Sequence, residues 1–298
     1  MTDQTLLYCV GATKAGTSWL YRMLHGHPEC LVRDVKEAHY WDTFDAKRCA
    51  GQLSAFAANH SKMLETREMV RRNGNKHREA NLTRQIDDMV GLVDVLESPR
   101  DDDARYWAWL SSGGEGKRVV AEMTPAYGLL DEAMLTRMSA LRPMTKFVYL
   151  IRDPLDRLWS HIRMVVSRQH GDVNLEARAN DAMAKVIAGQ KHADVAERGD
   201  YRATIEKLRR VVPASRLLVE FSERLMTAEG WARVCAFLGL THIAADKERK
   251  VHEGAKARMD AGLAADAVRF LKDQYDWVAE NVGPLPLNWQ NNLARAYA

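Results

Sequence analysis

Short runs of hydrophobic residues recur along the chain and are separated by longer amphipathic stretches. The first run, residues 6–10 (LLYCV), contains no charged side chain and stops at Gly11. An uninterrupted apolar run of this length is typical of a strand that is buried on both faces. Runs of the same character predict four further strands, at 30–32, 118–123, 146–151 and 217–219.

Helical periodicity occupies most of the chain between these runs. Buried strands that alternate with helices predict an α/β fold, here a P-loop-like, three-layer fold with a central, mostly parallel sheet flanked by helices. Ligands bind at the carboxyl ends of the strands in such folds, so we expect chemistry in the loops after Val10, Met123 and Ile151. The predicted helices cover residues 18–25, 131–141, 155–169, 174–189, 199–212, 229–238 and 264–280.

The segment 51–110 departs from this alternation. It is long, charged and rich in helix formers, with breaks near Gly74 and Pro99. No linker rich in proline, glycine or serine and no fixed-period repeat divides the chain. We therefore expect one domain over residues 1–298 that carries a helical insert at about 51–110, and we expect acceptor contacts in that insert.

The loop at residues 11–18 (GATKAGTS) joins the first predicted strand to a helix. Its small residues let the backbone wrap closely around a ligand, and the free N–H groups and dipole of a helix start attract anions. Lys14 adds a positive charge, but it lies two residues before Gly16, whereas the lysine of a Walker A motif directly follows the second glycine. The loop therefore predicts an anion site without specifying magnesium-nucleotide geometry. The alternative is an ordinary strand-to-helix turn.

The segment at residues 152–160 (RDPLDRLWS) begins where another predicted strand ends. Pro154 suits the first turn of a helix, and Asp153 suits its N-cap. An arginine fork at Arg152 with the hydroxyl of Ser160 nearby suits a phosphate monoester. The alternative interpretation is a structural ion pair between Arg152 and Asp153, with Ser160 merely exposed.

Together, TKAGTSW at 13–19 and RDPLDRLWS at 152–160 resemble the 5′-phosphosulfate loop and the 3′-phosphate motif of sulfotransferases that use 3′-phosphoadenosine 5′-phosphosulfate (PAPS). The resemblance implies a sulfotransferase that moves the sulfuryl group of PAPS to an acceptor hydroxyl or amine and releases the desulfated nucleotide (PAP). It also implies a set of nucleotide-binding residues, namely Lys14, Ala15, Gly16, Thr17, Ser18, Trp19, Arg152 and Ser160.

Other segments extend this resemblance toward the heparan-sulfate and other glycan sulfotransferases. KEAHYWD at 36–42 is similar to a segment whose glutamate is the catalytic base, which implies that role for Glu37, with Lys14 as the second catalytic residue. The alternative is that Glu37 only forms a surface ion pair with Lys36. AEMTPAY at 121–127 resembles their GEKTPxY segment, but Met123 replaces the lysine. The resemblance further implies Tyr201, Lys256 and Arg258 near the nucleotide, and Lys36, His39 and Met123 near the acceptor.

Composition and charge narrow the function further. The net charge of +3 is mild, so we expect no nucleic-acid partner. The four cysteines are scattered without CxxC spacing, which predicts free thiols and no metal site. No signal peptide and no long apolar span is recognisable, so we expect a cytoplasmic protein without an integral membrane segment. Its partner is then a small-molecule, glycan or lipid acceptor.

Two rival functions remain. A P-loop kinase shares the fold type and a phosphate-binding loop, although the displaced Lys14 and the lack of a recognisable strand-end aspartate for magnesium argue against it. A module that binds PAP without turnover is the second rival, and Glu37 argues against that. The sequence leaves the acceptor and the oligomeric state open.

Overall fold

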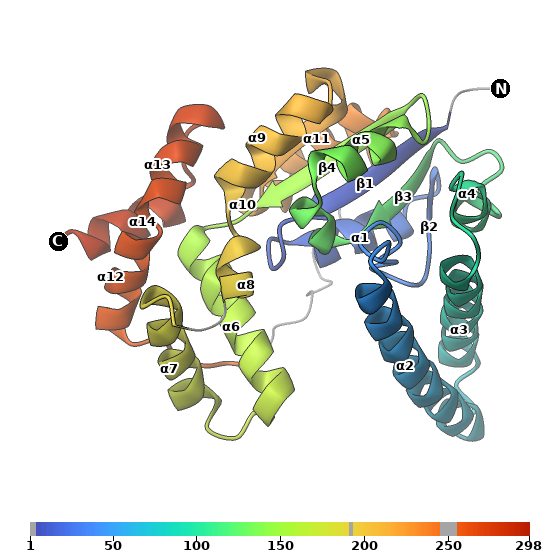
Figure 1. Cartoon of the computed structure of the whole chain (residues 1–298), viewed down its shortest axis with the longest axis horizontal. Helices are drawn as coiled ribbons and strands as arrows, with labels where there is room; N and C mark the ends of the chain where they lie inside the picture. Colours follow the sequence, from blue (N-terminus) through green and yellow to red (C-terminus); the bar gives the residue numbers. More distant parts are fainter. Residues whose placement is uncertain (1–3, 191–192, 245–254) are drawn as a thin grey trace.

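The computed structural model describes residues 4–190, 193–244 and 255–298, and a five-stranded sheet lies at its centre (Figure 1). All neighbouring strands are parallel, in the order β2-β3-β1-β4-β5. The predicted α/β fold is confirmed, and β5 extends two residues beyond its predicted end. The strands are β1 (Thr5–Gly11), β2 (Cys30–Val32), β3 (Val119–Met123), β4 (Thr145–Ile151) and β5 (Leu217–Phe221).

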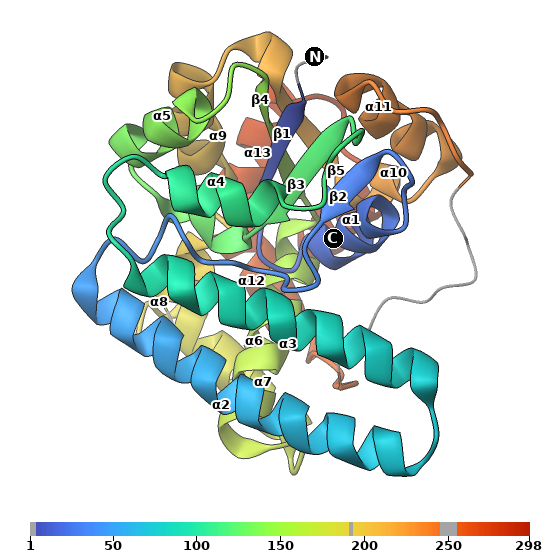
Figure 2. The ribbon, with the colours of Figure 1, turned by 90° about the vertical axis from the view of Figure 1, so that its right-hand side faces the viewer.

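The apolar runs in the sequence reflect a sheet that is covered on both faces. β1 lies in the middle and pairs with β3 on one side and β4 on the other, and residues 6–10 are fully buried. Figure 2 shows α1, α10 and α11 over one face of the sheet and α5 and α9 over the other. These helices are α1 (Thr17–His25), α5 (Glu132–Ala140), α9 (Tyr201–Val211), α10 (Ser222–Leu225) and α11 (Ala228–Leu238).

The remaining helices lie beyond the carboxyl ends of the strands. Short 3-10 turns follow β3 (Pro125–Leu129) and precede β5 (Ala214–Arg216). Among the described residues, no helix is both long and apolar enough to cross a membrane. The helices are α6 (Pro154–His170), α7 (Leu175–Ile187), α8 (Ala193–Glu197), α12 (Ala261–Phe270), α13 (Lys272–Asn281) and α14 (Leu287–Ala296).

The prediction of one helix at 264–280 is wrong. Two helices, α12 and α13, meet at Leu271, whose ψ of 4° leaves the helical range. Apolar side chains continue on both sides of the break, with Val268 and Tyr275 both buried, so the sequence pattern conceals it. The sequence analysis also missed α8, α10 and α14.

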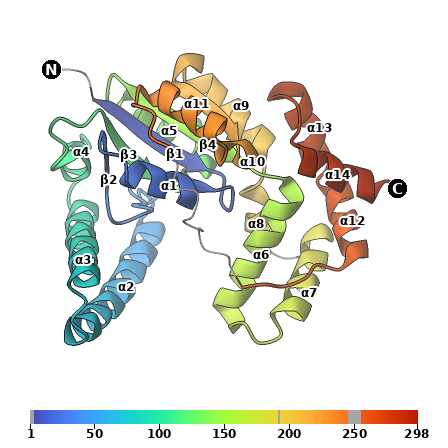
Figure 3. The same cartoon turned by 180° about the vertical axis from the view of Figure 1, so that it is seen from behind.

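The insert forms two long helices and a short one, with breaks where Gly74 and Pro99 predict them. They are α2 (Ala46–Arg72), α3 (Lys76–Glu97) and α4 (Ala104–Ser111). α2 begins five residues before the predicted start of the insert, because Asp45 caps it by accepting a hydrogen bond from the Arg48 N–H. The α2–α3 hairpin extends from the sheet on the same side as α6 and α7 (Figure 3).

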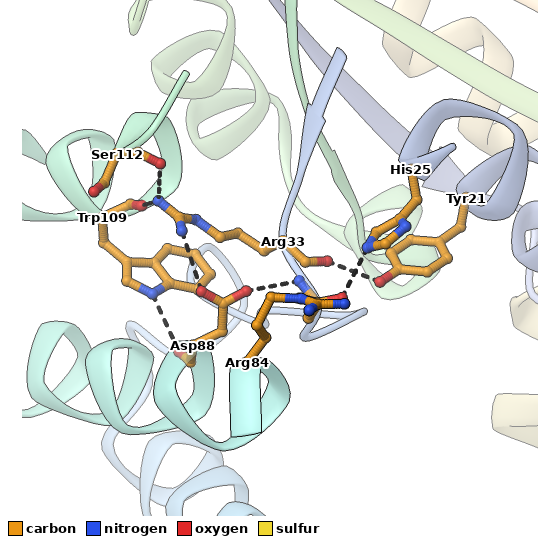
Figure 4. A network of polar contacts seen from close by, with 8 residues as sticks. Tyr21, His25, Arg33, Arg84, Asp88, Trp109 and Ser112 are labelled. Carbon is orange, nitrogen blue, oxygen red and sulfur yellow. Dashed lines mark hydrogen bonds and ion pairs between the residues drawn. The ribbon is translucent and has the colours of Figure 1, made fainter. Parts of the chain in front are cut away.

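One buried ion pair anchors this hairpin to the sheet (Figure 4). Arg33, which directly follows β2, donates to Asp88 of α3 at 3.1 Å and to the Ser112 carbonyl at 2.8 Å, and it also donates to the Trp109 carbonyl. The second Asp88 oxygen accepts the Asp34 N–H at 2.7 Å. The Arg33 and Asp88 side chains are only 14% and 16% exposed, so breaking the pair leaves a largely desolvated charge.

We therefore predict that Arg33→Ala lowers the free energy of unfolding by about 3 kcal/mol, the lower end for a broken buried pair. Arg71→Ala is the matched control, because Arg71 pairs only with Glu68 at 3.8 Å on an exposed face and should cost less than about 0.5 kcal/mol. Urea unfolding followed by circular dichroism measures both. Equal losses in the two variants would show that the Arg33–Asp88 pair does not anchor the hairpin.

Candidate active site

A cleft of about 870 Å³ lies at the carboxyl ends of β1, β4 and β5, at the end of the sheet that the topology predicts. Segments far apart in sequence line it, and among the described residues none comes from α2 or α3, where the sequence analysis expected acceptor contacts. The lining residues fall within 13–19, 36–39, 125–126, 152–168, 194–198 and 222–226, together with Asn288.

The loop between β1 and α1 forms one wall of this cleft. Gly16 has a φ of +93°, and a Cβ at this position would lie 2.9 Å from the Ser222 hydroxyl, so only glycine fits without strain. No side chain caps α1 at Gly16. The Trp19 N–H donates to the Gly16 carbonyl at 2.9 Å, whereas no backbone partner is found for the Thr17 and Ser18 N–H groups among the described residues, so these two are available to an anion. Of the predicted loop residues, all but the fully buried Ala15 line the cleft.

Lys14 is a half-buried cation among other cations. Its ammonium lies 3.9 Å from the sulfur of Met164 on α6, and no ion pair to a carboxylate is found for it in the described part of the chain. Burial, followed by the positive charges of Arg152 and Arg168, lowers the pKa of Lys14. Since the cleft concentrates positive charge, an anion bound there would restore the charged form of this lysine.

Arg152 and Ser160 face the same cleft from the start of α6. Arg152 donates to the Lys14 carbonyl at 3.5 Å, and its closest carboxylate is that of Asp156 at 3.7 Å. The alternative pairing of Arg152 with Asp153 is not found, because Asp153 caps α6 and accepts a hydrogen bond from Tyr275 at 2.8 Å. Within the residues that the structure describes, the guanidinium of Arg152 thus has one distant anionic partner, Asp156.

Asp153, the N-cap of α6, is fully buried. Asp153 accepts the Asp156 N–H at 3.1 Å and an amide hydrogen of Asn292 at 3.2 Å. Burial and the nearby Asp156 carboxylate raise the pKa of Asp153 to about 6. The predicted N-cap is confirmed, and it fixes the direction in which α6 leaves the sheet.

The opposite wall of the cleft carries Lys36, Glu37 and His39, so these residues line the same cleft as the loop at 13–19. Glu37 accepts a hydrogen bond from the Lys36 ammonium at 2.8 Å, as in the alternative interpretation, and yet it also lines the cleft. His39 lies between two carboxylates, 2.9 Å from Asp42 and 3.8 Å from Glu37. Burial lowers the pKa of His39, but the hydrogen bond to Asp42 and the two negative charges outweigh it and hold the pKa above its usual value.

Unusual backbone conformations gather at this cleft. Of the described residues, five that are not glycine have a positive φ, and three of these line the cleft: Lys14 at 71°, Glu37 at 67° and His39 at 55°. Such conformations cost free energy and persist where the surrounding structure imposes them, most often at functional sites.

Besides Ala15, four predicted site residues do not reach the cleft. Tyr201 is fully buried, and its hydroxyl donates to the Arg152 carbonyl at 2.6 Å, so it acts on the cleft only through Arg152. Met123 is 2% exposed at the end of β3. Lys256 and Arg258 are exposed on a segment along α6 and α7, where the Arg258 backbone bonds Glu176 and Asn180.

The cleft also contains residues that the sequence analysis missed. Four of them, His161, Met164, Val165 and Arg168, follow Ser160 at helical spacing, so extending the α6 face would have found them. Others come from α8 and α10 with the residues that follow them, and from α14, and only the tertiary fold brings them here; they include Arg198, Glu223 and Asn288. Within the described residues, no group of three or more His, Cys, Asp or Glu side chains is arranged to hold a metal ion.

The chain was compared with known structures and sequences. A crystal structure of a sulfotransferase from Alicyclobacillus acidocaldarius is similar, with a TM-score of 0.64 and 20% identity over 96% of this chain and 99% of that one. At this identity the similarity shows the shared fold. The sulfotransferase domain of the Synechococcus PCC 7002 olefin synthase has a TM-score of 0.48 and 16% identity over 92% of this chain and 96% of that one. The sulfotransferase domain from the curacin biosynthetic pathway has a TM-score of 0.49 and 16% identity over 100% of this chain and 98% of that one.

No curated protein sequence matches the chain. A sequence profile described as the sulfotransferase family matches residues 7–244, which is most of the chain. The matched region contains the loop at 13–19, Glu37 and the segment at 152–160. The match does not single out the heparan-sulfate type that the sequence motifs suggested. At the level of the family, the predicted resemblance is confirmed: the chain belongs to the sulfotransferase family.

Proposed function

We propose that this protein transfers the sulfuryl group of PAPS to an acceptor hydroxyl or amine. The observation that carries the proposal is the meeting of the loop at 13–19 with Arg152 and Ser160 in one positively charged cleft. Such a pair of adjacent anion sites suits a nucleotide with phosphate groups at two ends, as PAPS has at its 3′ and 5′ positions.

The groups that line the cleft fit each part of PAPS. The N–H groups of the α1 start, with Lys14, suit the 5′-phosphosulfate, and the guanidinium of Arg152 with the Ser160 hydroxyl suits the 3′-phosphate. On the far side of Gly16, one carboxylate oxygen of Glu223 is buried without a hydrogen-bond partner in the described structure. That oxygen can accept the N–H of an adenine amino group, and the Trp19 ring, which lines the same cleft, can pack against the base.

When bound, PAPS supplies the sulfuryl group. By analogy with phosphoryl transfer, positioning and charge stabilisation contribute most of the catalysis in an in-line transfer of this kind. Lys14 and the loop N–H groups stabilise the negative charge that develops on the leaving phosphate oxygen, at about 3 kcal/mol for each well-placed donor. Lys14 is suited to this role because no carboxylate among the described residues pairs with it and neutralises its charge.

Glu37 is the general base in this proposal. A base in reach of the acceptor takes its proton as the acceptor attacks the sulfur. The Lys36 ammonium and the His39 ring hold the Glu37 carboxylate from two sides, and Asp42 in turn holds His39. This arrangement fixes the carboxylate at the cleft while leaving its side chain 41% exposed to an incoming acceptor.

The acceptor is a small molecule, a glycan or a lipid headgroup. Where the glycan enzymes that the sequence resembles carry a lysine, this chain has Met123, which is buried and outside the cleft. A positive charge on the acceptor side must therefore come from elsewhere, and Lys36, Arg168 and Arg198 are the cations that line the cleft beyond the nucleotide motifs.

For the donor site, we predict that Arg152→Ala weakens PAP binding by about 10- to 100-fold, the cost of one charge-assisted hydrogen bond. Adenosine 5′-monophosphate lacks only the 3′-phosphate, so its affinity should be nearly the same in the wild type and the variant. Calorimetric titration measures both ligands. Arg202→Ala is the matched control, because it removes an exposed arginine on α9 that pairs with Glu206 at 3.1 Å.

Two results would contradict the donor assignment. If Arg152→Ala weakened both nucleotides equally, Arg152 would not read the 3′-phosphate. If ATP with magnesium bound to the wild type and PAP did not, the kinase function would replace the sulfotransferase function.

For the catalytic base, we predict that Glu37→Gln lowers the rate of sulfuryl transfer by about 10²- to 10⁴-fold and leaves PAP affinity unchanged. The rate is measured in single turnovers with labelled PAPS and an acceptor that a screen of alcohols, sugars and amines has identified. Glu65→Gln on the exposed side of α2 removes the same charge away from the cleft and should transfer at the wild-type rate. Wild-type transfer by Glu37→Gln would exclude Glu37 as the base, and PAP binding without turnover on any acceptor would favour the binding module.

A further inference from the structure

Arg157 is a buried cation whose partners are unusual. It lies in the first two turns of α6, is 1% exposed, and makes no ion pair with a carboxylate in the described part of the chain. Its guanidinium instead donates to the Val195 carbonyl at 2.8 Å and contacts Nδ1 of His161 at 3.3 Å. A Cβ on Gly199 would lie 2.5 Å from Arg157 Nε, so glycine is required for the backbone to pass this close.

This contact fixes the tautomer of His161. A guanidinium can only donate, so Nδ1 of His161 must accept, and the ring hydrogen must be on Nε2. Burial, and then the positive charge of Arg157, lowers the pKa of His161 to about 3. The ring is therefore neutral throughout the physiological range, with its single N–H at a known position.

The His161 side chain lines the cleft, and with Nδ1 against Arg157 its Nε2–H is the ring group left for a ligand there. The residue is 4% exposed and lines the cleft, and Nε2 has no partner in the structure as described. His161 directly follows Ser160 and precedes Met164, which lies against the Lys14 ammonium. The charged groups that face this part of the cleft are Lys14 from the loop, Arg168 from α6, and Asp194 and Arg198 from α8 and its end.

We infer that His161 is a nucleotide-binding residue, whose Nε2–H donates a hydrogen bond to a phosphate oxygen of the bound donor, and that Arg157 is its positioning residue. The inference rests on the proposed function, because it needs an anionic nucleotide between Ser160 and Lys14. A neutral donor suits this place, since another cation beside Lys14 and Arg168 would add repulsion to the free protein. The neutral ring therefore helps to orient the bound phosphate without changing the net charge of the cleft.

Nitrogen-15 spectroscopy of the histidine rings tests the positioning step in the wild-type protein. The His161 resonances, assigned by their loss in His161→Gln, should show the Nε2–H tautomer and should not titrate between pH 5 and 8. Addition of PAP should shift the Nε2 resonance. A ring that titrates near its ordinary pKa, or one that carries its hydrogen on Nδ1, would overturn the inference about Arg157.

The binding step is tested by comparing two variants. His161→Leu removes the donor and should weaken PAP binding by about 10- to 100-fold. His161→Gln offers an amide N–H at a similar distance and should retain most of the affinity. Because the wild-type ring is neutral, the ratio of wild-type to His161→Leu affinity should be the same at pH 6 and pH 8. A ratio that is larger at pH 6 would mean that a protonated His161 makes the contact, and that result would overturn the inference.

Gly199→Ala provides an independent test, because its methyl group displaces the guanidinium without changing either His161 or any group that contacts the nucleotide. We expect a mixture of His161 tautomers and weaker PAP binding in this variant. If the wild type does not bind PAP, the proposed function fails while the tautomer measurement still stands. If the wild type binds PAP and His161→Leu binds it equally well, this inference fails and the proposed function stands.

Discussion

The parallel pairing of β1 with β4 is the constraint on which the cleft depends. The register places Gly11 beside Tyr149, and the Ala12 N–H continues the ladder by donating to the Leu150 carbonyl at 2.7 Å. Both strands end at the same edge of the sheet, so Arg152 meets the backbone of Lys14 although 138 residues separate them. A one-residue shift between these strands would turn the two anion-binding segments away from each other.

Charge is distributed unevenly around this edge. In the described part of the chain, no carboxylate pairs with Lys14, and Arg152 has only Asp156 at 3.7 Å. The buried carboxylate of Asp153 instead caps α6, and Glu37 lies on the opposite wall, paired with Lys36. Burial, followed by the positive charges of Arg152 and Arg168, lowers the pKa of Lys14. Repulsion between these cations costs the ligand-free protein some stability, and a bound anion would neutralise them. This arrangement is usual at sites for phosphorylated ligands.

Local sequence signals predicted the fold class, the five strands and the two segments, 13–19 and 152–160, that meet in the cleft, because these depend on short apolar runs and on loop chemistry. The break at Leu271 and the helices α8, α10 and α14 were missed. Apolar periodicity continues through the break, and α8 and α10 have only five and four residues, whereas the apolar pattern of α14 would have supported a helix. Tertiary packing also decides which side chains reach the cleft. It places Tyr201 behind Arg152 and brings in Arg198 and Glu223, and no spacing in the sequence contains that information.

The central claim is that one nucleotide spans the loop at 13–19 and the start of α6. A crystal structure of the protein with PAP tests it most directly. The account predicts the 5′-phosphate on the N–H groups of the α1 start beside Lys14, and the 3′-phosphate between Arg152 and Ser160. A structure in which PAP binds elsewhere, or in which its 3′-phosphate contacts neither Arg152 nor Ser160, would contradict it.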